Sequence, residues 1–528
     1  MRAYYEQQGV EAWRKGIVPH YITSNPFIAQ SYARQIVGLI RDLVRDGWSP
    51  DKGDAPLHVV ELGAGSGRFS FLLLRAIEER LELLALPRTC VRYVATDLVD
   101  KNVAYMREHP QFVPFFDDGR FDVAQLNLET GDRLLLQRSE TTIGPGDLAR
   151  PLVLIGNYIF DSLTHDMFRV ERGALIEIQT RLRGPAPDAE ASGAPPEAPA
   201  GTDTDPSFRG LRLENQDRPV DGAYYDDPVI DDLLDHYRTV LDAACVLMPI
   251  GAIRAMRRMA ALADGRMMVL SSDKAFQKPA DFDPQLPYLA LHGSASMTLN
   301  LHALGAVTTR QGGEALMPTA YAASLSSATL LWGFDRVEPR EVRLAFRETF
   351  GVFSPDDFFA IGRMLQTSIE SMRVEDIVAY VRYGHWDADV LHHALARLTA
   401  LVQEDGVSSY VEDTLLEAIE RVWANHYHLG EQNNLPHHIG RLLEAMGHHA
   451  EALRYHRASR QRYQDHPAIL LRIAVCQQAL GDLDAARSTL LEALTLDPAH
   501  EDVRNRLHRV NSARARRAAA VGDSDGAR

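Results

Sequence analysis

The sequence predicts an α/β domain built on a parallel sheet, followed by an all-α region that ends in a helical repeat. Three observations support this prediction. Short apolar runs alternate with helical patterns through residues 1–335, which is typical of a parallel sheet with helices on both faces. Residues 336–430 carry only helical patterns, and we expect a helical linker region there. From residue 431 onward a spacing of 34 residues recurs, which indicates repeated helical hairpins.

The composition narrows the classes of function. The chain has 528 residues, 45% of them hydrophobic and 24% charged, as in a globular protein of several domains. Acidic residues number 72 and basic residues 56, and the formal net charge of -16 disfavours nucleic acid as a partner, because phosphate binding requires excess cations. Cys90, Cys245 and Cys476 lie far apart, so we expect a reducing, cytoplasmic environment, no disulfides and no metal site. The sequence contains no run of about 18 apolar residues, so we expect no membrane span. The first residues lack the apolar stretch of a signal peptide.

The elements of the first domain follow one another in the order that a parallel sheet requires. An apolar strand begins at residue 57 and runs into a glycine turn that ends at residue 67. We expect further strands, some running into turns, at 91–97, 121–129, 151–163 and 266–276. We expect helices at 26–46, 69–84, 98–109 and 246–265. Residues 184–206 are almost entirely Gly, Pro, Ala, Ser, Thr and acids, so we expect a disordered insertion within the domain.

The helical region is expected to end in repeats. Gly447 and Gly481 lie 34 residues apart, as do Ala452 and Ala486, and small residues at these places let two helices approach closely. This pattern is similar to the tetratricopeptide repeat over residues 431–513, although an unrelated helical hairpin is an alternative. The resemblance implies a groove for a protein or peptide, and the helices before residue 431 would complete the stack. We expect a disordered tail at residues 514–528.

Two further features of the helical region are local. Ser354 precedes Pro355 and two acidic residues, which predicts the N-cap of a helix. The histidines at positions 426 to 449 lack the i, i+4 pairing with carboxylates that a metal site requires, so we interpret them as a solvated helical surface.

The strongest chemical signal is the segment VVELGAGSGRFS, in which Glu61 precedes Gly63, Gly65 and Gly67. Glycines allow a sharp turn and the close approach of a ligand to the backbone. The dinucleotide fingerprint G-x-G-x-x-G fails because Arg68 stands at its last position. A phosphate-binding loop requires a lysine that is missing from the segment.

The remaining pattern, E-x-G-x-G-x-G, resembles the first motif of class I S-adenosylmethionine (SAM) methyltransferases. The resemblance implies a Rossmann-like fold in which the glycine loop packs beneath the methionine and ribose of SAM. It also implies that Asp97, at the end of the next strand, accepts hydrogen bonds from the ribose hydroxyls. Asn127, after the third strand, would contact the adenine. A nicotinamide-binding fold and a degenerate fold without cofactor are the alternatives.

Candidate catalytic residues follow the fourth predicted strand. The carboxyl ends of parallel strands form the ligand crevice, which places Asn157, Asp161, His165 and Asp166 near the reacting centre. Alternatively, Asp161 caps a helix and His165 is a surface residue. Asp161 could hold or deprotonate a nitrogen nucleophile.

The segment N-Y-I-F-D-S-L-T from Asn157 to Thr164 is similar to the fourth-strand motif N/H-E-F-F-D-A-L-P of the MidA-type methyltransferases. That group includes the mitochondrial complex I assembly methyltransferase. HYITSNPFIAQSYARQI near the N-terminus is similar to the family segment that lies over the cofactor, and Tyr21 within it could line the pocket with Tyr158. Members of known activity methylate protein arginine, but Tyr158 stands here in place of a family glutamate, so the acceptor stays open.

These observations predict a SAM-dependent methyltransferase that acts on a protein or peptide, with the repeats recognising the partner. Methyl transfer requires alignment and exclusion of water more than a strong catalytic motif. Two alternatives are a methyltransferase for a small molecule of secondary metabolism and a non-catalytic assembly scaffold with a degenerate methyltransferase fold.

Overall fold

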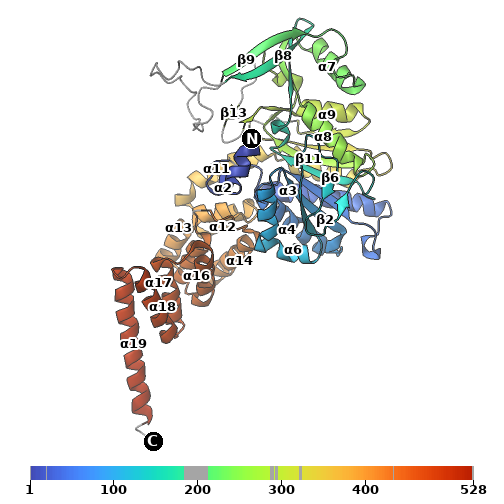
Figure 1. Ribbon diagram of the computed structural model, residues 1–528. Helices are drawn as coiled ribbons and strands as arrows, with labels where there is room; N and C mark the ends of the chain where they lie inside the picture. Colours follow the sequence, from blue (N-terminus) through green and yellow to red (C-terminus); the bar gives the residue numbers. More distant parts are fainter. Residues whose placement is uncertain are drawn as a thin grey trace, which may run out of the picture. The chain divides into compact units, whose positions relative to one another are not determined.

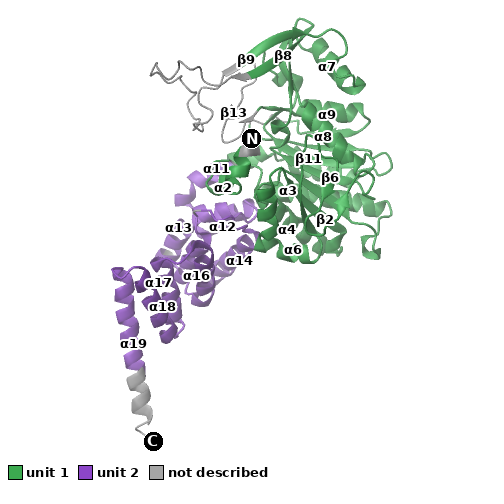
Figure 2. Ribbon diagram, viewed as in Figure 1, with its two compact units in different colours: residues 1–360 green, residues 361–528 purple. Residues whose placement is uncertain are grey.

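The computed structural model describes residues 2–18, 21–183, 212–285, 290–291, 295–319, 324–431 and 433–525. The chain divides into two compact units, residues 1–360 (unit 1) and 361–528 (unit 2), as Figures 1 and 2 show. Unit 1 extends past residue 335 because α10 (Arg340–Phe346) packs against α3 (Pro26–Arg45). The buried carboxylate of Asp42 on α3 accepts the backbone N–H groups of Glu341 and Val342 at the start of α10.

Unit 1 is built on a mixed sheet in which the described strands follow the order β16-β17-β11-β6-β1-β2-β3. The five strands from β3 to β11 are parallel, and β17 runs antiparallel to both of its neighbours. This arrangement confirms the predicted α/β fold class. The strands are β1 (Leu57–Leu62), β2 (Val91–Asp97), β3 (Phe121–Gln125), β6 (Leu152–Asn157), β11 (Met267–Asp273), β16 (Glu314–Leu316) and β17 (Ser326–Trp332).

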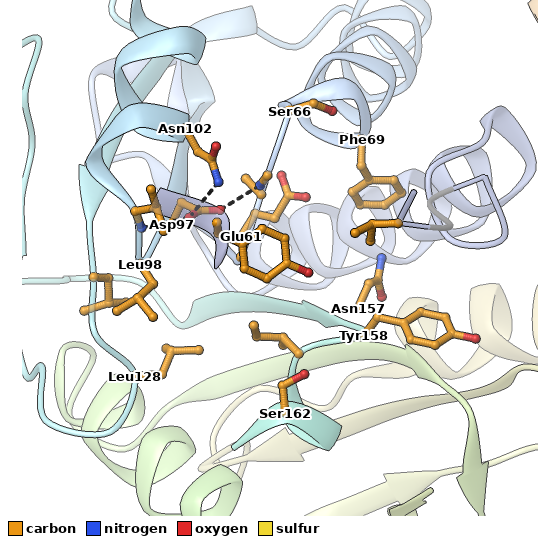
Figure 3. A pocket seen from close by; sticks show the side chains of 18 of the residues that line it. Glu61, Ser66, Phe69, Asp97, Leu98, Asn102, Leu128, Asn157, Tyr158 and Ser162 are labelled. Atoms are coloured by element: carbon orange, nitrogen blue, oxygen red, sulfur yellow. Dashed lines mark hydrogen bonds between the residues drawn. The ribbon is translucent and has the colours of Figure 1, made fainter. Parts of the chain in front are cut away.

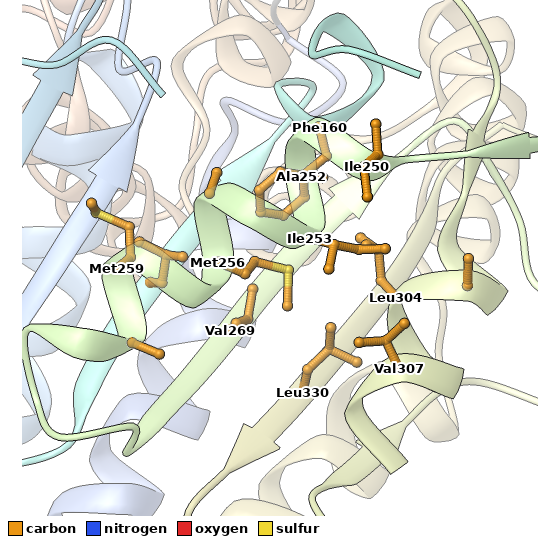
Figure 4. Packing of buried hydrophobic residues seen from close by; sticks show 14 of the residues in the cluster. Phe160, Ile250, Ala252, Ile253, Met256, Met259, Val269, Leu304, Val307 and Leu330 are labelled. Carbon is orange, nitrogen blue, oxygen red and sulfur yellow. The ribbon is translucent and has the colours of Figure 1, made fainter. Parts of the chain in front are cut away.

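Helices cover both faces of this sheet because the strands carry apolar side chains on both faces. On one face, Ile253 and Met256 of α8 and Leu304 of α9 pack against Val269 and Leu330 of the sheet (Figure 4). On the other face, α3 packs against α4 and α10 and reaches the sheet through the Tyr32 hydroxyl. The helices of unit 1 in addition to α3 and α10 are α1 (Arg2–Gln8), α2 (Glu11–Arg14), α4 (Arg68–Leu83), α5 (Asp100–Glu108), α6 (Val113–Asp117), α7 (Pro228–Val240), α8 (Ile250–Ala261) and α9 (Leu301–Arg310).

A second, antiparallel sheet follows β6, with described strands in the order β10-β7-β8-β9. Its strands are β7 (Asp166–Glu171), β8 (Ala174–Arg183), β9 (Arg212–Pro219) and β10 (Ala243–Met248). The predicted insertion at 184–206 lies outside the described residues, and the strands on either side of it pair with each other, Arg183 opposite Arg212. The helix predicted at 246–265 is wrong at its start, because residues 246–248 belong to β10, which pairs with β7.

Short strand pairs complete the described part of unit 1. They are β4 (Leu134–Leu135) with β5 (Thr142–Ile143), β12 (Ala275–Phe276) with β15 (Leu299–Asn300), and β13 (Ala290–Leu291) with β14 (Ala295–Ser296). The helix α11 (Pro355–Thr367) begins after Ser354 as predicted, and the Ser354 hydroxyl accepts the backbone N–H of Asp357. No helix among the described residues is long and apolar enough to cross a membrane.

Unit 2 is helical, and successive helices pair as hairpins around one core. Gly447 and Gly481 end the first helix of two hairpins with positive φ angles, 85° and 82°. Ala452 and Ala486 are fully buried, which explains why small residues recur there. The helices are α12 (Val374–Tyr383), α13 (Ala388–Asp405), α14 (Ser409–Asn425), α15 (Leu435–Ala445), α16 (His449–Tyr463), α17 (Pro467–Ala479), α18 (Leu483–Leu496) and α19 (Glu501–Asp525).

Three expectations for this region need correction. Helices α12–α14 share one hydrophobic core with the repeats, so residues 361–430 are part of the packed unit rather than a linker. The segment expected to be a disordered tail from residue 514 continues α19 as far as Asp525, because its alanines and arginines favour a helix. The described histidines between positions 426 and 449 are buried or half-buried rather than solvated.

Candidate functional site

The glycine loop lies where β1 ends and α4 begins. The chain order along the sheet reverses between β1 and β6, and such a switch point opens a crevice at the carboxyl ends of the strands. Gly63, Gly65 and Gly67 all have positive φ angles of 63°, 58° and 79°. At Gly65 a side chain is also excluded by space, since a Cβ would lie 2.7 Å from the Trp13 ring. The loop therefore requires glycine, as predicted, for two reasons: its φ angles are positive, and the Trp13 ring lies too close to Gly65 for a side chain there.

Asp97 lies at the end of β2, directly beside the glycine loop (Figure 3). Its Oδ2 accepts the Gly65 N–H at 3.0 Å, and its Oδ1 accepts the Val99 N–H at 2.9 Å and the Asn102 amide at 3.2 Å. Burial raises the pKa of Asp97, and these hydrogen bonds oppose that rise. A carboxylate oxygen accepts about two hydrogen bonds, so one position on Oδ2 stays available.

Asn102 on α5 supplies a second acceptor at the same place. Its Nδ2 donates to Asp97, and its Oδ1 is buried without a hydrogen-bond partner among the described residues. The sequence analysis missed Asn102 because it belongs to no motif. Its only signal is its place five residues after Asp97, in the first turn of α5.

Glu61 is the second acid of the site and lies near the end of β1, 5% exposed. Its Oε2 accepts hydrogen bonds from Ser70 and, at 2.7 Å, from Tyr93. The pKa of Glu61 is raised to about 7, because burial and the neighbouring Asp97 raise it more than the hydroxyl donors of Ser70 and Tyr93 lower it. Glu61 therefore changes charge near neutral pH.

These residues line a cavity of about 290 Å³, within the described part of the chain. The cavity contains the carboxylates of Glu61, Asp97 and Glu129 but no lysine or arginine among its described lining residues. Apolar side chains, including Leu98 and Leu128, line the wall next to Asp97 (Figure 3). Such a cavity favours a ligand with a flat apolar part and net positive charge, and disfavours phosphates.

The predicted adenine contact, Asn127, also lines this cavity. Its Oδ1 accepts the backbone N–H of Glu129 at 3.0 Å, which fixes the turn after β3. Glu129 was missed by the sequence analysis, and its carboxylate accepts the N–H and hydroxyl of Thr164 at 2.8 and 2.9 Å. This carboxylate therefore ties the turn after β3 to the segment that follows β6.

The three predicted catalytic residues occupy different environments. Asn157 lines the cavity; its Oδ1 accepts from the Tyr32 hydroxyl and the Ser272 N–H, whereas its Nδ2 is buried without a described partner. Asp161 and His165 are not among the described lining residues, whereas Ser162, in the same short 3-10 turn at Phe160–Ser162, and Leu163 line the cavity. Catalysis by either residue stays a prediction.

The surroundings of Asp161 and His165 are nevertheless polar. Asp161 is 6% exposed and lies near the fully buried Asp273, whose pKa is raised well above its usual range by burial and then by repulsion from Asp161. His165 binds the Leu163 carbonyl through Nδ1 at 2.7 Å, and burial lowers its pKa. A half-buried imidazole with a lowered pKa and a buried carboxyl group with a raised pKa therefore lie near the turn that follows β6.

Tyr158 lines the cavity in an unusual conformation. Its φ angle is +48°, which costs a non-glycine residue about 1 kcal/mol or more and is found preferentially at functional sites. Figure 3 shows its side chain beside that of Asn157. Tyr21, its proposed companion, is not among the described lining residues and instead contacts Phe359 edge-on.

The N-terminal segment closes one side of the cavity. Tyr5 of α1 and Trp13 of α2 both line it, and their rings stack with centroids 5.6 Å apart. Thr23 and Ser24, within the segment HYITSNPF, line it as well, and the next residue, Asn25, caps α3 by accepting the Ile28 N–H at 3.1 Å. Sequence reasoning missed Tyr5 and Trp13 because neither belongs to a motif.

Comparisons with known proteins identify one region of the chain. Residues 443–510 match the family model of the tetratricopeptide repeat. This match confirms the repeats predicted from the spacing of glycine and alanine. A search of curated protein sequences gives no match.

Two solved structures from Burkholderia thailandensis resemble the chain. The first is a COG1565 superfamily member crystallised with S-adenosyl-homocysteine, with 16% identity, a TM-score of 0.34, and coverage of 56% of this chain and 62% of that one. The second is an uncharacterized COG1565 superfamily protein, with 15% identity, a TM-score of 0.33, and coverage of 60% and 72%. The chain thus spans less than two thirds of the length of the first protein.

Proposed function

We propose that unit 1 binds SAM and transfers its methyl group to a protein or peptide acceptor that the repeats of unit 2 help to recognise. The observation that carries this proposal is the cavity at the β1–β6 switch point. Two buried acids, Glu61 and Asp97, flank its glycine loop, and no lysine or arginine is among its described lining residues. A dinucleotide or nucleoside triphosphate carries phosphates that such a cavity would repel.

The polar atoms of the cavity fit the parts of SAM. Two vicinal ribose hydroxyls require two acceptors, and Asp97 Oδ2 and Asn102 Oδ1 supply them. The ammonium group requires a carboxylate, and Glu61 supplies Oε1, which has no hydrogen-bond partner among the described residues. The adenine would lie along the apolar wall near Leu98, with Asn127 at its polar edge.

The unpartnered Nδ2 of Asn157 completes this set. As a donor at the end of β6, it would bind the carboxylate of SAM or an oxygen of the acceptor. Its orientation is fixed because Oδ1 is held by Tyr32 and by the backbone of Ser272. Asn157 is therefore a positioning group with one free donor.

When bound, SAM supplies a methyl carbon attached to a positively charged sulfur. An acceptor nitrogen forms the new bond to carbon, the electrons of the broken carbon–sulfur bond stay on sulfur, and the acceptor loses one proton. Tyr158 and Ser162 line the side of the cavity from which an acceptor would enter (Figure 3). Asp161 and His165 are the proposed proton acceptors, through solvent or a movement of the turn that carries them.

Unit 2 supports a macromolecular acceptor because tetratricopeptide stacks commonly bind peptides or proteins. Since both units are on one chain, a bound partner would be present at a high effective concentration for transfer. We expect no nucleic acid partner, in keeping with the net charge of -16.

Calorimetry on the full chain tests the cofactor assignment. Asp97→Ala removes the acceptor for the ribose and the carboxylate that holds Gly65 and Val99, and SAM binding should fall below detection. Arg172→Ala, on an exposed turn away from the cavity, is the matched control and should bind as the wild type does. Unchanged affinity in Asp97→Ala would remove SAM as the ligand of this cavity.

A further inference from the structure

A compact group of metal-ligating side chains lies in the core of unit 2. It consists of Glu444 on α15, His456 on α16 and Cys476 on α17, each offering one ligand atom within 4.8 Å of the others. His456 and Cys476 are fully buried. Three successive helices thus bring three different ligand types to one point, although they are 12 and 20 residues apart along the chain.

The imidazole of His456 is held in place by its neighbours. Its ring lies against Gly440, where a Cβ would be 2.5 Å from ring carbon Cε1. Its Nε2 is 2.6 Å from Glu444 Oε1, which orients the ring. Its Nδ1 is buried and has no hydrogen-bond partner in the described chain.

A second histidine, His437, lies close to this group. His437 lies two turns before Glu444 on α15, and its ring centroid is 5.4 Å from that of His456. Its Nδ1 is also buried without a partner among the described residues.

We propose that Glu444, His456 and Cys476 bind a divalent metal ion of the zinc class, with His437 as the fourth ligand. One thiolate, two imidazoles and one carboxylate suit a tetrahedral Zn²⁺ site. Ligand atoms around such an ion lie about 3.3–3.7 Å apart. The ligand atoms of Glu444, His456 and Cys476, within 4.8 Å of one another, therefore close by about 1 Å on binding, and the His437 ring moves in to complete the coordination.

Binding exchanges the thiol proton for the metal. The metal–sulfur bond forms as the proton leaves to solvent. The guanidinium of Arg472, 3.4 Å from Glu444 Oε2, opposes a dication, so binding requires that this exposed side chain turn outward.

Co²⁺ titration of the full chain, first freed of metal with a chelator, tests this proposal. We expect one equivalent per chain and a near-ultraviolet absorption band from charge transfer between thiolate and Co²⁺, which Zn²⁺ should displace. Cys476→Ser should abolish the band, whereas Cys245→Ser, a buried cysteine of unit 1, should retain it.

If Cys476→Ser does not fold, Glu444→Gln tests the site instead. It keeps an acceptor for His456 but not the charge, and should weaken Co²⁺ binding at least tenfold with unchanged helical circular dichroism. Absence of a stoichiometric Co²⁺ complex, a complex without the thiolate band, or a band that persists in a folded Cys476→Ser protein would each overturn the site.

Discussion

The raised pKa of Glu61 makes SAM affinity depend on pH. Burial raises this pKa to about 7, so the carboxyl group is largely protonated at pH 6. An ammonium group beside Glu61 stabilises the charged form and lowers its pKa, and binding therefore releases a proton. The affinity for SAM should rise with pH through 7 and level off about one unit above this pKa.

The size of the effect follows from the ionised fraction. With a pKa of about 7, about 9% of Glu61 is ionised at pH 6 and about 76% at pH 7.5. The affinity should therefore increase about eightfold between these values, equivalent to about 1.3 kcal/mol. Any contribution of Asp97, whose pKa burial also raises, has the same sign.

Calorimetry at the two pH values measures this dependence, and Glu61→Gln is the control. Glutamine keeps an acceptor for Ser70 and Tyr93 but does not titrate. The variant should bind SAM more weakly at pH 7.5 and lose most of the pH dependence, while any titration of the ligand itself stays the same in both proteins. Equal pH dependence in the two proteins would refute the role of Glu61.

Three further changes follow from particular contacts. Asn102→Leu removes the unpartnered Oδ1, and SAM affinity measured by calorimetry should fall about tenfold. Gly65→Ala places a Cβ 2.7 Å from the Trp13 ring at a φ of +58°, and denaturant titration should show a loss of about 1–3 kcal/mol, only partly restored by adding Trp13→Ala. Ala486→Leu overpacks a fully buried position and should lower the unfolding free energy by about 1–3 kcal/mol, whereas the exposed Ser488→Leu should leave it nearly unchanged.

The sheet could be predicted where apolar runs end in glycine or an acid, as at β1 and β2. The segment that begins at Val246 was misassigned because VLMPIGAI is apolar throughout and fits a strand or a helix equally well. Residues 246–248 form a strand because β10 pairs with β7, and β7 lies more than 70 residues earlier in the chain. The second sheet escaped prediction for the same reason, since its hairpin is interrupted by residues 184–211.

The residues of the site also fall into two groups, those that a local motif predicts and those that it does not. Glu61, the three glycines and Asp97 were predicted because neighbouring strands carry them at fixed places in a motif, and all five line the cavity or its loop. Trp13 and Asn102 reach the cavity from a helix before the sheet and from the side of α5, and no local pattern marks either residue. Contacts between distant segments bring such residues to the cavity, and no residue spacing in a single sequence indicates those contacts.

The unpartnered atoms around the cavity favour a protein that binds a ligand over a degenerate fold that has lost its cofactor. Asn102 Oδ1 and Asn157 Nδ2 are buried without described partners beside the same cavity. Each costs about 1–3 kcal/mol if nothing binds to it, and most buried polar groups in native proteins are paired. A fold that binds no ligand here gains nothing from this cost, whereas a ligand that supplies both partners recovers it.

The same atoms do not choose between a protein and a small-molecule acceptor, because both asparagines would contact the cofactor end of the cavity. Incubating the full chain with radiolabelled SAM and host lysate separates the two. Label in protein that is lost in Asp97→Ala would support the proposed acceptor class, and label confined to small molecules would support secondary metabolism. Binding of SAM without any labelled product would favour the scaffold, since the cavity would then hold a cofactor that it does not use.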